Sequence, residues 1–84
     1  MFDYSADAEL FSGRRGRRQL RSEMKYRRFP AAAEAVRFAI EALPPDMLGG
    51  AYLEVNEERF DAAQIRVLYD SSDFPLPREK ARPA

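Results

Sequence analysis

The sequence predicts a single small α+β domain, in which a sheet of two or three strands packs on a central helix and a shorter C-terminal helix follows. Three segments carry this prediction. Residues 30–43 have the apolar spacing of an amphipathic helix, residues 51–56 alternate like a strand, and residues 61–71 begin with a helix-capping pattern. A chain of 84 residues is near the small end of those that fold around a single core.

The composition narrows the chemistry of the chain. It has neither cysteine nor histidine, which excludes disulfides and thiolate catalysis and removes the usual general base. No serine lies in a GxSxG pattern, and no glycine motif for phosphate binding is present, so we expect no enzyme, cofactor or metal site. No apolar run is long enough to cross a bilayer and no basic-then-apolar leader opens the chain, so we expect a cytoplasmic protein without membrane contact.

The first residues are expected to lie outside the folded unit. Residues 1–12 are acidic with scattered aromatics, and a helical turn after Ser5 would be too short to be stable alone. Residues 13–19 combine two glycines with four arginines, which is typical of a solvated, flexible arm. We therefore predict a mobile N-terminal segment, one α+β domain and a disordered tail, at residues 1–19, 20–77 and 78–84.

The first strand is expected within residues 20–29. Met24 and Tyr26 alternate with Lys25 and Arg27, and this period of two directs Tyr26 toward the core.

Residues 30–43 form the predicted central helix. Pro30 suits the first helical position, where its missing N–H needs no partner, and Pro44 ends the helix. Val36 and Ile40 lie on the face that should meet the core.

Glu34, Arg37 and Glu41 form a charged stripe along this helix, and one side of the helix, here called the shoulder, lies on neither that stripe nor the core face. Either a neighbouring loop or the C-terminal tail covers it, or it is a surface for self-association or a protein partner. The candidate interface residues are Phe38, Ala35 and Ala42.

A second strand is expected at residues 51–56. Asn56 tolerates left-handed backbone angles and suits a tight turn, after which Arg59 and Phe60 pair back as a short third strand. If the strands at 20–29 and 51–56 are parallel, the central helix is the right-handed crossover of a βαβ unit. The alternative is an antiparallel arrangement in which the hairpin alone forms the sheet.

The C-terminal helix is predicted over residues 62–71, because Asp61 and Gln64 have the spacing of a capping box. The alternative is a strand in which Ile65, Val67 and Tyr69 alternate. Downstream, Phe74 and Leu76 are expected to dock on the domain.

The net charge is zero, but residues 14–28 carry eight basic residues against Glu23 alone. Guanidinium groups pair with phosphates, and Tyr26 and Phe29 have rings suited to stacking on bases. Short arginine runs also serve as solubilising linkers, so both interpretations stay open. The candidate polyanion-binding residues are Arg14, Arg15, Arg17, Arg18, Arg21, Lys25, Arg27 and Arg28.

Residues 24–43 resemble the first half of ribbon-helix-helix DNA-binding proteins, with Lys25 and Arg27 in the base-facing positions. That family continues with a second helix, whereas two adjacent glycines and a β pattern follow here, which makes that helix implausible. An acidic cluster is better explained by turn and capping positions than by a metal site; it comprises Glu54, Glu57, Glu58 and Asp61.

Residues 26–78 resemble a group of short uncharacterised alphaproteobacterial proteins. The shared motifs are YRRF-x-x-AAEA-x-RFA-x-E-x-LP and LEV-x-EERFD-x-x-x-IR-x-LYDS. The resemblance implies one compact α+β unit after a variable basic arm, and it implies no activity, cofactor or functional residue. We therefore expect a non-enzymatic binding or protein-interaction module, with a homodimer or protein partner at the Phe38 shoulder. The alternative is nucleic-acid binding through residues 14–28.

Overall fold

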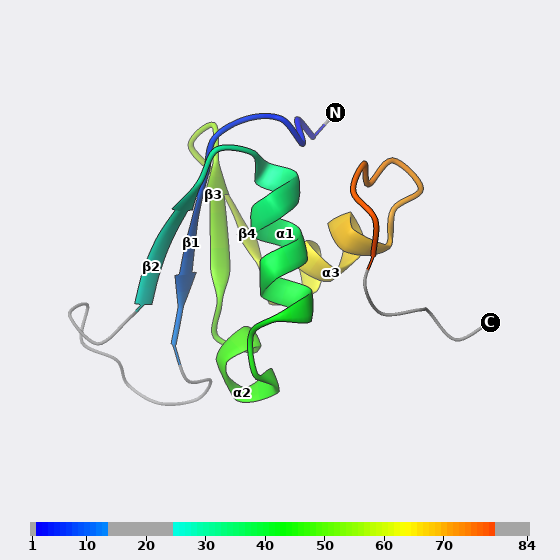
Figure 1. Cartoon of the computed structure of the whole chain (residues 1–84). Coiled ribbons are helices and arrows are strands. Elements are labelled where there is room, and N and C mark those ends of the chain that lie inside the picture. Colours follow the sequence, from blue (N-terminus) through cyan, green and yellow to red (C-terminus); the bar gives the residue numbers. More distant parts are fainter. Residues whose placement is uncertain (1, 14–24, 79–84) are drawn as a thin grey trace.

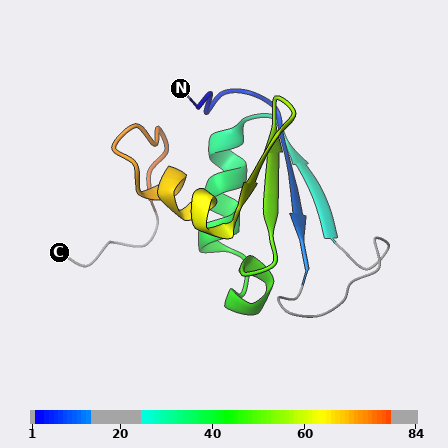
Figure 2. The same ribbon diagram turned by 180° about the vertical axis from the view of Figure 1, so that it is seen from behind.

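The computed structural model describes residues 2–13 and 25–78. Its elements are β1 (Ala8–Ser12), β2 (Lys25–Phe29), α1 (Ala32–Glu41), α2 (Pro45–Leu48), β3 (Tyr52–Val55), β4 (Glu58–Asp61) and α3 (Ala62–Asp70). Within these residues, four strands form an antiparallel sheet in the order β2-β1-β3-β4, with α1 and α3 on one face (Figures 1 and 2). The predicted α+β class is confirmed, whereas the sheet has four strands and not the expected two or three.

The additional strand is β1, which lies in the segment expected to be mobile. It pairs antiparallel with β2 on one side and with β3 on the other, so it is central in the sheet. Leu10 is buried opposite Leu53, whereas Phe11 lies on the other face, opposite Tyr52. The other two inward residues of β1 are Ala8 and Ser12, which are small. The alternation of apolar and polar residues that indicates a strand is therefore weak in this segment. The predicted start of the domain at residue 20 is therefore wrong.

β2 and β3 are both antiparallel to β1, so they are parallel to each other with β1 between them. α1 connects them over one face of the sheet, and Figure 1 shows the right-handed sense of this crossover. The two strands of the predicted βαβ unit are therefore parallel but not neighbours.

β2 faces the opposite way from the prediction. Phe29 is buried under α1, and the period of two places Arg27 on the same side. Tyr26 lies opposite Phe11 and is 53% exposed, so its expected place in the core is wrong. The prediction relied on Met24 and Tyr26 to choose the inward face of this strand. The burial of Phe29 shows that the opposite face of β2 is directed inward.

α1 begins at Ala32, two residues later than Pro30, because Ala31 is the extended N-cap residue. This end has no side-chain cap. Instead, the carbonyl of Tyr4 accepts a hydrogen bond from the N–H of Ala33 at 2.9 Å, which satisfies one of the unpaired donors of the first turn. The N-terminal segment is thus tied to the helix as well as to the sheet. The chain after α1 forms the short α2 and then β3, so no second long helix of the ribbon-helix-helix kind follows.

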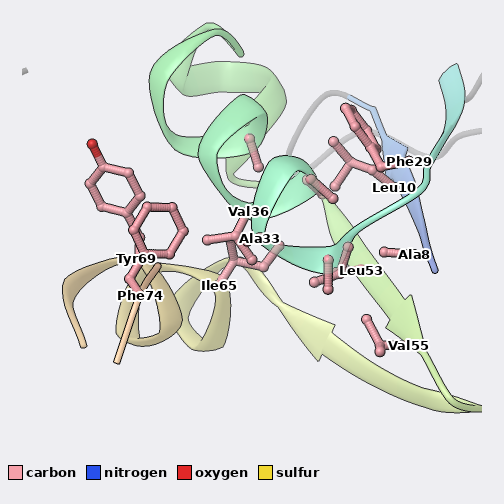
Figure 3. Close-up of a cluster of buried hydrophobic side chains, with 14 residues drawn as sticks. Ala8, Leu10, Phe29, Ala33, Val36, Leu53, Val55, Ile65, Tyr69 and Phe74 are labelled. Carbon is pink, nitrogen blue, oxygen red and sulfur yellow. The ribbon is translucent and has the colours of Figure 1, made fainter. Parts of the chain in front are cut away.

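The core lies between the sheet and the two longer helices (Figure 3). Val36 from α1, Leu53 from β3 and Ile65 from α3 are its largest fully buried side chains. The β3–β4 turn has φ values of 52° at Asn56 and 68° at Glu57, which agrees with the predicted tight turn.

α3 carries the predicted capping box. The Asp61 carboxylate accepts from the N–H of Gln64, and the Gln64 side chain accepts from the N–H of Asp61, both at 2.9 Å. Val67 is 67% exposed, which fits the helix and contradicts the alternative strand.

The segment after α3 folds back on the domain. Phe74 is buried against Tyr69, and Leu76 packs on the core, as expected. The Arg78 guanidinium donates to the carbonyls of Tyr69 and Ser71 and lies over the ring of Phe74. Arg78 is therefore part of the folded unit, although the disordered tail was predicted to begin there; residues 79–84 lie outside the described residues.

Candidate binding surface at the edge strand

The predicted polyanion-binding residues do not form one cluster within the described residues. Lys25 and Arg27 lie on the α1 side of β2, whereas Arg28 lies on the helix-free face. There Arg28 forms an exposed ion pair with Asp7 at 3.2 Å. The remaining candidates lie outside the described residues: Arg14, Arg15, Arg17, Arg18 and Arg21.

β2 is the outermost strand on its side of the described sheet (Figures 1 and 2). Its residues 25–28 are all exposed, and no other described element lies along its outer edge. In an antiparallel ladder, alternate residues direct their N–H and C=O groups away from the paired neighbour. Among the described residues, no further strand pairs with the outer edge of β2, and a strand edge of this kind is a template for a further strand.

The predicted interface residues have different environments. Ala35 is 0% exposed in the core, so it cannot contact a partner and its assignment is corrected. Ala42 is exposed as the C-cap residue of α1. Phe38 is half-buried, with its ring centroid 5.5 Å from that of Phe29 and 4.7 Å from the guanidinium carbon of Arg27. Among the described residues, Phe29 and Arg27 of β2 pack on Phe38, whereas Ala42 stays exposed.

Arg27 is held by these two rings. Its guanidinium carbon lies 4.7 Å from the centroid of Phe38 and 5.1 Å from that of Phe29. The ion pairs within the described part of the chain join Arg28 to Asp7 and Arg59 to Glu54, and none involves Arg27 or Lys25. A guanidinium that packs on aromatic rings still directs its N–H groups outward in the plane of the group. Arg27 is thus an oriented donor at the sheet edge.

An aromatic row crosses the helix-free face. Phe11 lies between Tyr26 at 5.1 Å and Tyr52 at 4.8 Å, and its ring is stacked on that of Tyr52 with an interplanar angle of 16°. From the neighbouring strand β4, the guanidinium of Arg59 covers Tyr52 at 4.3 Å. Tyr52 is therefore enclosed by Phe11 and Arg59, which come from strands on either side. The row is a self-stacked ladder, not a platform that offers its ring faces to bases.

The polar groups of this face also pair with one another. The Tyr26 hydroxyl donates to Glu9 at 2.7 Å, and this hydrogen bond to the carboxylate raises the pKa of Tyr26. Arg59 donates to Glu54 at 3.1 Å, and Asp61 is used as the cap of α3. Among the described residues, no group of acidic side chains is arranged to hold a metal ion. Several polar groups of the helix-free face are thus already paired within the described residues.

No described helix has the length and hydropathy that a bilayer crossing needs. The chain matches no protein-family model, no curated protein and no solved structure. The assignment of a function therefore rests on the geometry of the described residues.

Sequence reasoning placed Arg27 and Phe38 in two separate candidate sites and missed their contact. A signal for it was present. If Phe29 is taken as the inward residue of the first strand, Arg27 shares its face and meets the helix shoulder, because residues two apart in a strand lie on the same side.

Proposed function

We propose that this protein is a non-enzymatic protein-interaction module that binds an extended segment of a partner protein as an additional strand on β2. One observation carries the proposal: β2 is the outermost strand on its side of the sheet, its residues 25–28 are exposed, and within the described part of the chain no further strand pairs with its outer edge. Strand addition uses main-chain hydrogen bonds for affinity and neighbouring side chains for specificity. The binding surface differs from the expected one, since Phe38 contributes from beneath Arg27.

A peptide selection tests the proposal and does not require the partner to be identified first. Random peptides of about eight residues, which is long enough for a typical strand, are displayed and selected on the full chain. NMR then maps the selected peptide on the labelled protein. We expect backbone NOEs between the peptide and residues 25–29.

A chemical control separates strand addition from side-chain binding. N-methylation of alternate peptide nitrogens removes the donors that face β2 and leaves the side chains unchanged. We expect binding to be lost when the methylated nitrogens face the protein. Equal binding of both methylated versions, or a peptide that binds elsewhere, would rule out strand addition on β2.

A second candidate function is polyanion binding through residues 14–28. The observation in its favour is that Ser12 pairs with Lys25, so the arginine run belongs to the connection between two paired strands and not to a free N-terminal tail. A titration with short mixed-sequence DNA and RNA tests it. Salt-dependent shifts that disappear when Arg14, Arg15, Arg17 and Arg18 are changed to Ser support this function, and the absence of shifts at low salt contradicts it.

A further inference from the structure

We infer that the segment bound by β2 is acidic, with one carboxylate that pairs with Arg27 and a second, two residues away, that pairs with Lys25. This inference rests on the proposed strand addition and specifies the chemistry of the partner. The site is the α1 side of the sheet edge, where Arg27 lies over Phe38.

The orientation of Arg27 is the first step. Packing on Phe38 and Phe29 limits the rotation of the side chain, so less conformational entropy is lost when its N–H groups bind a carboxylate. A residue directly opposite Arg27 on an added strand would have its Cβ about 5 Å away, which is within reach of a Glu or Asp side chain. Arg27 therefore selects a carboxylate at that position.

The alternation of side chains between the two faces of β2 determines which residue types the bound segment should have at its other positions. Lys25 shares the face of Arg27, so the second carboxylate belongs two residues from the first. On the helix-free face, Tyr26 is 53% exposed and its hydroxyl is bonded to Glu9, which leaves its ring to meet an apolar side chain. Arg28 already pairs with Asp7. The recognised pattern is thus acidic, apolar, acidic.

The same charges argue against other occupants. Pairing of β2 with the β2 of a second copy would bring the cations of both strands into one ladder, where like charges oppose each other. A nucleic acid offers phosphate acceptors for outward N–H groups but no comparable row of donors for the outward carbonyls, whereas a peptide strand supplies both. An acidic extended protein segment satisfies the backbone and the side chains of β2 together.

Three matched peptides test the inference on the full chain. Their sequences are Thr-Val-Glu-Val-Glu-Val-Thr and the versions in which both glutamates are replaced by glutamine or by lysine. Affinities are measured by fluorescence anisotropy with end-blocked peptides. At low salt we expect the glutamate peptide to bind roughly tenfold more tightly than the glutamine peptide, because two exposed ion pairs contribute to its affinity.

Substitutions of Arg27 identify the group responsible. Arg27→Gln should remove most of the preference for glutamate and leave the affinity of the glutamine peptide unchanged. Arg27→Lys keeps the charge but lacks the planar fork, so it should restore only part of the preference. The control is Arg66→Gln, which removes an exposed cation from α3 and should leave the preference unchanged.

The outcomes distinguish this inference from the function on which it rests. If all three peptides bind at β2 with equal affinity, or the lysine peptide binds best, the acidic pattern is wrong and strand addition stands. If none of the three binds and the selected peptides also fail to reach β2, strand addition itself is wrong. A preference for glutamate that Arg66→Gln reduces as much as Arg27→Gln would show general charge attraction and overturn the inference.

Discussion

Arg27 and Phe38 lie against each other where β2 meets α1, with the guanidinium carbon 4.7 Å from the ring centroid. This contact covers an aromatic ring that would otherwise lie on the surface, and it fixes a cation at the edge of the sheet. A basic residue and an apolar residue thereby contribute to the same surface. Substitution of Arg27 should therefore change both the stability of the domain and the binding of a peptide to β2.

Removal of the Arg27 side chain should uncover Phe38. We expect Arg27→Ala to lower the free energy of unfolding by roughly 0.5–1 kcal/mol, as for other exposed cation–π contacts. Urea denaturation followed by circular dichroism measures this change. Arg66→Ala, on the exposed face of α3, is the control; an equal loss in both variants would mean that the contact with Phe38 contributes nothing.

The central position of β1 predicts a large effect of Leu10→Ala. Leu10 is 2% exposed and lies opposite Leu53, so its truncation should cost about 2–4 kcal/mol through lost burial and a cavity. Val67→Ala, at a side chain that is 67% exposed, should change stability by less than about 0.5 kcal/mol. If Leu10→Ala were as mild as Val67→Ala, β1 would not be part of the core.

The capping box of α3 predicts a graded series at Asp61. Asp61→Ala removes the acceptor for the N–H of Gln64 and should cost about 1 kcal/mol, whereas Asp61→Asn keeps an acceptor and should cost less. Chemical denaturation of both variants gives the comparison. Asp73→Ala, at an exposed carboxylate outside any helix, is the charge-matched control and should be nearly neutral.

Tyr69 predicts a loss of stability at alkaline pH. Burial, together with a hydrogen bond from its hydroxyl to Glu41, raises the pKa of Tyr69 from the ordinary 10.0 to about 12. Because the folded state holds the phenolic proton more tightly, this stabilisation is complete below pH 10 and is lost as the pH rises toward 12. The melting temperature of the native protein should fall more steeply over this range than that of Tyr69→Phe. Parallel curves would contradict the raised pKa.

The sequence correctly predicted the elements that are indicated by patterns among residues close together in the chain. The Asp61–Gln64 spacing identified α3, the Asn56 turn identified the β3–β4 hairpin, and the apolar periodicity identified the body of α1. Each of these depends on contacts between residues close in the chain, which sequence patterns report directly. Even so, the start of α1 was placed too early, because the N–H of Ala33 is satisfied by the distant Tyr4 and not by a local cap.

The elements that were missed depend on distant contacts. β1 has small inward residues on either side of Leu10 and an outward Phe11, so its alternation is weak, and its place in the sheet comes from pairing with β2 and β3. The sequence analysis also placed Arg27 and Phe38 in two separate candidate sites, although the two side chains are in contact. Ala35 was assigned to the surface because the shoulder of α1 looked uncovered, whereas Ala35 is fully buried in the core.

The availability of the outer edge of β2 is the claim that matters most, and amide hydrogen exchange of the full chain measures it directly. In the free protein we predict that alternate amides of residues 25–29 exchange rapidly, whereas the amides of β1, which has a neighbour on each side, are protected. The glutamate peptide should then protect the rapidly exchanging amides of β2. If every β2 amide is already protected in the free chain, the edge is covered and strand addition at this site is excluded.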